Sequence, residues 1–121
     1  MYSAVVLTPE SHDKLVERFK GAFPEDWTTY AHHMTINMGP INPNYKEYLG
    51  KEFDLEVISF AKDELVAAAG VRGFPTNNEI PHITLGVNKM GGGKPFFSNK
   101  LKDWTALPTP FTITGRVQEV N

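Results

Sequence analysis

The chain has 121 residues, no cysteine and a formal net charge of −2 at pH 7, with 40% hydrophobic and 21% charged residues. This length fits a single domain over residues 1–121, and the composition excludes a disordered or fibrous chain. The lack of cysteine excludes disulfides, thiolate zinc sites and cysteine nucleophiles. The slight negative charge gives no support to tight binding of long nucleic acid. No secretory signal or membrane-spanning run is recognisable, so we expect a cytoplasmic protein without membrane contact.

The first third of the chain predicts a strand, a helix and a second strand. Residues 4–7 are a short apolar run with two valines, which favours a buried strand. Thr8 and Pro9 are typical of a helix start and predict a helix over residues 9–21. Apolar and polar side chains alternate in the second half of residues 27–38, as in a strand with one buried face.

The remainder predicts four more strands and a second short helix. Residues 53–60 and 65–71 favour a β-hairpin, although the consecutive alanines in the second segment favour helix by propensity alone. Residues 82–87 and 111–120 alternate as strands do, and residues 98–104 suit a short helix. The order indicates a mixed α+β domain without a linker or a second module.

Two of the predicted strands carry the same polar pattern. His33 and Thr35 flank an apolar residue on one strand, and His82 and Thr84 do so on the other. Each pair shares a face, roughly 6.5–7 Å apart along the strand. Two such faces across a groove would surround one small anion with two imidazoles and two hydroxyls. One neutral imidazole can take a proton from water, the opposing imidazolium can protonate a leaving oxygen, and the hydroxyls can donate to phosphate oxygens, without a metal or cofactor.

The other histidines are expected in lesser roles. His32 should point to the opposite face of the strand from His33, as a core or supporting residue, and His12 should be exposed on the helix. The polar loop before His82 favours His82 as the base that activates water. The aromatic segment before His33 favours His33 as the acid, although these roles can exchange with the direction of attack.

The segments His33 to Ile36 and His82 to Leu85 resemble the paired His-x-Thr-apolar motifs of the 2H phosphoesterase superfamily. Their contexts look closest to the cyclic phosphodiesterase domains of fungal and plant-type tRNA ligases and their phage-encoded relatives. The resemblance spans most of the chain. It implies a two-lobed α+β fold, in which antiparallel sheets flank a central cleft and helices lie outside. It also implies action on 2′,3′-cyclic phosphates of RNA ends or nucleotides.

Five further residues are candidates for substrate binding. Arg72, Lys89 and Lys94 lie close in sequence to the second motif and could contact a phosphate. Phe74 and Tyr45 could stack on a base. For the charged residues a solvated surface position is the competing interpretation, and for the aromatic residues it is a place in the core.

The leading functional hypothesis is hydrolysis of a 2′,3′-cyclic phosphate to a 2′-phosphate. One alternative is an enzyme of phage or host that degrades cyclic oligonucleotide signals, and another is a nucleotide-binding module without turnover. A histidine metal site is disfavoured because threonine is a poor ligand and neither motif contains a carboxylate. The base preference and the oligomeric state are not indicated by the sequence.

Overall fold

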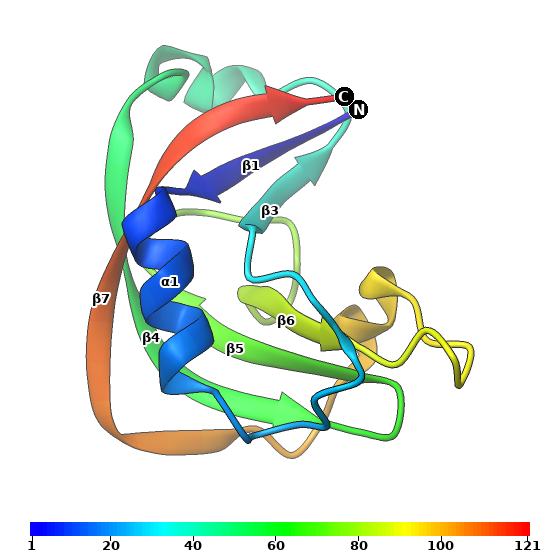
Figure 1. Cartoon of the computed structure of the whole chain (residues 1–121). Helices are drawn as coiled ribbons and strands as arrows, with labels where there is room; N and C mark the ends of the chain where they lie inside the picture. The colour runs from blue at the N-terminus through cyan, green and yellow to red at the C-terminus, as the bar shows by residue number, and fades with distance from the viewer.

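Alternating apolar and polar residues make β-strand the main secondary structure of the computed structural model, which describes residues 1–121 (Figure 1). In chain order the elements are β1 (Tyr2–Leu7), α1 (Pro9–Arg18), β2 (Thr28–Thr29), β3 (His33–Met38), the 3-10 helix η1 (Pro43–Tyr48), β4 (Glu52–Lys62), β5 (Val66–Arg72), β6 (His82–Val87), the 3-10 helix η2 (Pro95–Lys100) and β7 (Thr105–Val120). No helix is both long and apolar enough to cross a membrane.

Six strands close into one antiparallel barrel, in the order β6-β3-β1-β7-β4-β5, and β5 pairs with β6 to complete the ring. The expected two-lobed α+β fold with sheets flanking a cleft is therefore wrong. The reason lies in β4 and β7, which have 11 and 16 residues. Each of these strands is long enough to belong to both of the sheets that we expected to be separate. β7 pairs with β1 over residues 115–120 and with β4 over most of residues 105–116, so the sheets merge into one.

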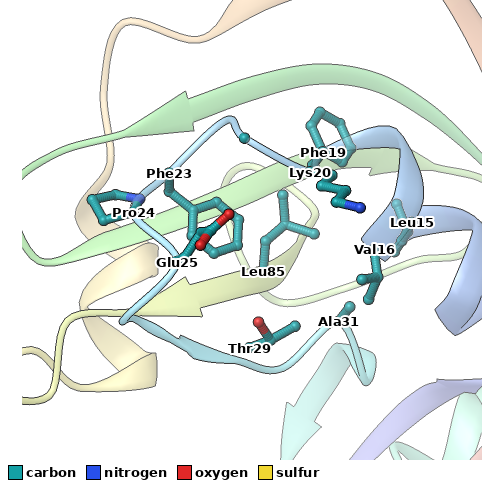
Figure 2. Close-up of a pocket in the computed structure, with 11 residues that line it drawn as sticks. Leu15, Val16, Phe19, Lys20, Phe23, Pro24, Glu25, Thr29, Ala31 and Leu85 are labelled. Carbon is teal, nitrogen blue, oxygen red and sulfur yellow. The ribbon is translucent and has the colours of Figure 1, made fainter.

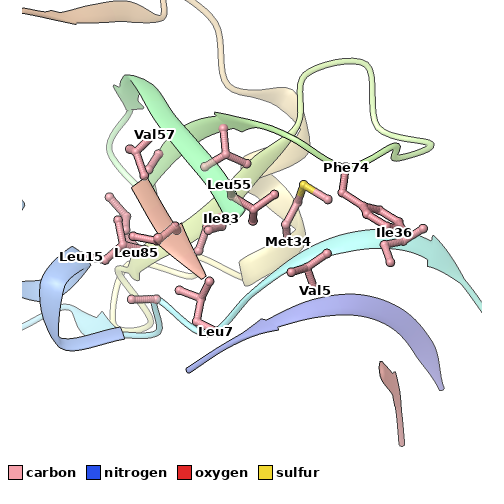
Figure 3. Close-up of a cluster of buried hydrophobic side chains, with 14 of the residues drawn as sticks. Val5, Leu7, Leu15, Met34, Ile36, Leu55, Val57, Phe74, Ile83 and Leu85 are labelled. Carbon is pink, nitrogen blue, oxygen red and sulfur yellow. The ribbon is translucent and has the colours of Figure 1, made fainter. Parts of the chain in front are cut away.

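The barrel interior is a continuous apolar core (Figure 3). Met34 and Ile36 of β3 and Ile83 and Leu85 of β6 all belong to it, each with at most 1% of its surface exposed. Exposing any one of them would cost about 1.5–3 kcal/mol. Because neighbouring residues of a strand face opposite sides, the polar residues of both motifs are held on the outer face of the barrel wall.

Several local predictions differ from the structure. The hairpin of β4 and β5 is confirmed, and its alanines lie in β5 because they are fully buried against neighbouring strands. The first helix ends at Arg18, three residues earlier than predicted. The predicted strand over residues 27–38 is interrupted between β2 and β3, and the predicted helix over residues 98–104 is instead the 3-10 helix η2, which begins at Pro95.

Candidate functional site

The site lies where β3 and β6 meet, which is the most weakly paired seam of the barrel. These strands share one registered pair, Met34 with Ile83, whereas each of the other seams has five or more. Beyond this pair the regular β3–β6 ladder stops. On one side the amides of Tyr30 and Ala31 donate to carbonyls of β6, and on the other the amide of Asn77 donates to the carbonyl of Ile36.

The four motif residues flank that single pair. Continuing the antiparallel register by one residue in each direction places His33 across from Thr84, and Thr35 across from His82. The two imidazoles then lie on a diagonal of the pattern, where Cβ atoms in a regular sheet are roughly 7–8 Å apart. All four side chains line one cavity of about 640 Å³, a volume typical of small-molecule sites. Their catalytic roles remain predictions.

A bulge before β3 sets the direction in which this strand enters the site. Thr29 pairs with Gly86 and Met34 with Ile83, so five steps on one side match three on the other and two residues are extra. Ala31 lies within this bulge in the left-handed conformation, with φ of +49°. The fold must hold this unfavourable backbone in place.

Hydrogen bonds hold Ala31 from both sides. Its amide donates to the carbonyl of Thr84 (2.9 Å), and its carbonyl accepts from Nδ1 of His12 on α1 (2.9 Å). His12 is therefore half-buried and fastens the helix to the bulge, which differs from the exposed position we expected.

The bulge also explains why the prediction for His32 is wrong. His32 precedes β3 rather than lying in it, so strand alternation does not apply, and it is exposed at the cavity wall instead of buried in the core. Its Nδ1 lies 2.9 Å from Nδ1 of His33. A contact between two imidazole nitrogens needs one donor and one acceptor, so these two atoms hold one proton between them.

His33 is held in its neutral form. Burial lowers its pKa to about 4, with smaller contributions from the nearby His32 and His82. The ring lies against Tyr2, at 4.8 Å between centroids, and burial raises the pKa of that phenol. Since Nδ1 faces His32, the other nitrogen, Nε2, is left for a substrate or water. When the proton between the two rings lies on Nδ1 of His33, the neutral ring presents an unprotonated Nε2 near neutral pH.

His82 is more buried than the sequence suggested, with 6% of its surface exposed. Its Nδ1 donates to the carbonyl of Ile80 (2.7 Å), which closes a tight turn around the start of β6. Its Nε2 lies 3.1 Å from Oγ of Ser98 on η2, and the indole of Trp104 lies beside the ring at 6.2 Å between centroids. The expectation that His82 lies nearer to solvent than His33 is wrong, because η2 covers it.

Apolar packing holds η2 in this position. Leu101, the residue that ends η2, is buried in a second cluster with Ala61, Ala68 and Val87 on the outside of the barrel. This anchor presses η2 against β5 and β6. As a result Ser98, only 2% exposed, lies between the ring of His82 and the hydroxyl of Thr84.

The rest of the cavity wall consists of neutral polar and aromatic groups. Four amide side chains and three aromatic rings contribute to it: Asn37, Asn77, Asn78, Asn99, Tyr2, Tyr30 and Phe96. Phe96 is 57% exposed although it is a large aromatic residue. The lining includes no lysine or arginine.

None of the five secondary candidates lines this cavity. Arg72 pairs with the carboxylate of Glu56 across β4 and β5. Phe74 is 7% exposed and belongs to the core, where Tyr45 packs edge-on against it. The aromatic residues are therefore structural, and the arginine already has an anionic partner on the neighbouring strand.

The two lysines lie nearer, but outside the wall. The ammonium of Lys89 sits over the ring of Tyr30, 5.4 Å from its centroid. Lys94 is exposed at the residue before η2. Neither lysine lines the cavity, although Pro95, the residue after Lys94, does.

A second, smaller cavity of about 190 Å³ lies between α1 and β6 (Figure 2). Leu15 and Val16 of α1, and Phe19 just after it, face Phe23 and Leu85 there. Its wall is mainly apolar and contains no histidine or hydroxyl pair. The four motif residues line the larger cavity, and none of them lines this one.

Sequence reasoning missed the residues that come from distant elements. The amides of Asn77 and Asn78 reach the cavity only through the path of the chain, and no motif marks them. The stretch from Lys94 to Asn99 supported the resemblance to the 2H family, but the sequence did not assign Ser98 a place beside His82 and Thr84. The chain has no cluster of three or more histidine, aspartate or glutamate side chains arranged to hold a metal ion.

Comparisons with protein-family models, with curated proteins and with solved structures found no match for this chain. The resemblance to the 2H phosphoesterases accordingly remains a prediction from the two motifs.

Proposed function

We propose that this protein is a phosphodiesterase of the 2H type, which hydrolyses 2′,3′-cyclic phosphates of nucleotides or RNA ends to 2′-phosphates without a metal. The observation that carries the proposal is the convergence of His33, Thr35, His82 and Thr84 on one cavity from two strands. A lone histidine on a strand would support no such assignment. Two imidazoles with two hydroxyls supply an acid, a base and donors to phosphate oxygens at one place.

The state of His33 reverses the acid and base roles favoured by the sequence. A ring with a pKa of about 4 is unprotonated near pH 7 and suits the base. Nε2 of His33 takes a proton from water as the water oxygen bonds to phosphorus. The bond from phosphorus to O3′ breaks, and O3′ receives a proton supplied by His82. Thr35 and Thr84 donate hydrogen bonds to the non-bridging oxygens, where negative charge is held through the transition state.

The character of the cavity wall supports a nucleotide as substrate. The exposed ring of Phe96 and the ring of Tyr30 offer surfaces on which a base can stack. The side chains of Asn77, Asn78 and Asn99 offer donors and acceptors for base edges or ribose hydroxyls. These residues replace Tyr45 and Phe74 as candidates for base recognition.

The test is a substrate panel in EDTA with product analysis. Nucleoside 2′,3′-cyclic phosphates, RNA with a cyclic end, and cyclic di- and trinucleotides are incubated with the purified protein, and products are assigned by mass and by phosphate position. Turnover of the cyclic phosphates to 2′-phosphates in EDTA is expected. Turnover of the cyclic oligonucleotides alone would favour the signal-degrading alternative, and binding without turnover would favour an idle module. Activity lost in EDTA and restored by a divalent ion would refute a metal-independent mechanism.

The same assay ranks the four motif residues. His33→Ala and His82→Ala should each lose at least about a hundredfold in turnover, since each removes a general acid or base. Thr35→Ala and Thr84→Ala should lose about tenfold to a thousandfold, as for removal of one donor to a developing charge. Either histidine variant with near wild-type turnover would refute the paired mechanism.

A further inference from the structure

Ser98 stands at the centre of a hydrogen-bond cluster in the wall of the cavity. Its Oγ lies 3.1 Å from Nε2 of His82, 2.8 Å from Oγ1 of Thr84 and 2.7 Å from the carbonyl oxygen of Pro95. One buried hydroxyl is thus in hydrogen-bond contact with both polar residues of the second motif.

Counting protons limits how this cluster can work. The carbonyl of Ile80 only accepts, so Nδ1 of His82 carries a proton that stays there. Any proton that His82 exchanges must therefore pass through Nε2, and the atom in hydrogen-bond contact with Nε2 is Oγ of Ser98.

The serine hydroxyl has one proton, which it can donate to the carbonyl of Pro95 or to an unprotonated Nε2 of His82. When His82 is doubly protonated, Nε2 donates to Oγ of Ser98, and the serine donates to the carbonyl of Pro95. When His82 is neutral, the serine can turn and donate to Nε2. The hydroxyl can therefore serve both forms of the ring by a rotation about one bond.

We propose that Ser98 is the residue that passes the proton of His82 to the leaving oxygen of the substrate; this rests on the proposed function. Nε2 of His82 gives its proton to Oγ of Ser98 while the serine proton moves to O3′ as the bond from phosphorus to O3′ breaks. His82 ends neutral, Ser98 ends with one proton as before, and the ribose gains its hydroxyl. In the resting cluster the serine donates to the carbonyl of Pro95, so Thr84 donates its one proton to Oγ of Ser98 and holds it in place. Thr84 turns from the serine to the phosphate when the serine proton moves to O3′.

The experiment uses two substrates that differ in their need for an acid. A nucleoside 2′,3′-cyclic phosphate expels an alkoxide that must be protonated. A 2′-deoxynucleoside 3′-(4-nitrophenyl phosphate) expels a stable phenolate that needs little protonation. Turnover and KM are measured for the wild type, Ser98→Ala, His82→Ala and His33→Ala. Lys100→Ala, an exposed change on the same 3-10 helix, is the matched control.

Ser98→Ala should lose about a hundredfold in turnover on the cyclic phosphate, with KM nearly unchanged, and less than about tenfold on the nitrophenyl ester. His82→Ala should follow the same pattern, whereas His33→Ala should lose heavily on both, since its role as base is needed for either leaving group. Ser98→Thr, which keeps a hydroxyl, should recover part of the lost turnover.

Two results would overturn the proposal while the proposed function stands. One is wild-type turnover by Ser98→Ala on the cyclic phosphate. The other is an equal loss on both substrates with no recovery in Ser98→Thr, which would mean that the serine only supports the structure. Thermal unfolding of each variant separates loss of fold from loss of proton transfer. A wild type that turns over neither substrate would instead refute the proposed function itself.

Discussion

Because His33 is neutral in the folded protein, the protein should lose stability in weak acid. A substitution of His33 should abolish this loss. In the unfolded chain a histidine titrates near its ordinary pKa of 6.5, whereas in the folded chain the pKa of His33 is about 4. Between these values the unfolded state binds a proton that the folded state does not. The free energy of unfolding must therefore fall as the pH falls from 6.5 to 4, and it should change no further from this cause below pH 4.

The magnitude follows from the difference between the two pKa values. Each unit corresponds to about 1.4 kcal/mol, so the full difference amounts to about 3 kcal/mol at most, because partial access of water to the half-buried ring reduces it. Out of a typical stability of about 5–15 kcal/mol this is a large share.

The assay compares the wild type with His33→Gln, which cannot titrate. Urea unfolding followed by tryptophan fluorescence at pH 7, 6, 5 and 4 gives the free energy of unfolding for each protein. Carboxylates also titrate in this range, but they are common to both proteins and cancel in the difference. The wild type should lose up to about 3 kcal/mol more than the variant between pH 6.5 and 4. Parallel curves would refute a depressed pKa and the assignment of His33 as the base.

Three further outcomes are expected. His32→Ala removes one cause of the low pKa of His33, so the acid limb of the pH–rate curve, where the base becomes protonated, should move to higher pH; an unmoved limb would contradict this coupling. Gly73→Ala should destabilise the fold by about 1–3 kcal/mol more than Gly50→Ala in urea unfolding: both glycines have positive φ, but only at Gly73 would a Cβ meet backbone, at 2.5 Å from the carbonyl oxygen of Asp54. Arg72→Ala should keep full turnover and change stability by less than about 1 kcal/mol, since its partner Glu56 lies on the exposed surface of the barrel; a loss of affinity for nucleotide would return Arg72 to the site.

The strand periods of β3 and β6 could be predicted from the sequence, because inward apolar residues decide which way each motif faces. Met34 and Ile83 are buried at the seam, and this alone turns His33 and His82 outward. The prediction of two polar faces thus rested on burial, the strongest local signal in a strand.

The closure of the barrel could not be predicted in this way. Pairing of β5 with β6, and of β7 with both β1 and β4, depends on contacts between segments far apart in the chain. The alternation of residues within one strand does not indicate which strand it pairs with. The position of His32 was missed for a related reason. A bulge shifts register, and its two extra residues are visible only when the partner strand is known.

The single pair between β3 and β6 has a consequence for the motions of the barrel. β3 itself shares one ladder pair with β6, whereas the other neighbouring strands of the six-stranded ring share at least five. β2 and the bulge before β3 add further backbone bonds to the same edge of β6, so we expect local opening to be easiest at Met34 and Ile83 and not along the whole seam. Amide hydrogens of Met34 and Ile83 should then exchange with solvent faster than those of Val5 and Val117, which pair in the middle of the long β1–β7 ladder. Local opening at this pair would widen the cavity while the long ladders of β7 with β1 and β4 stay paired.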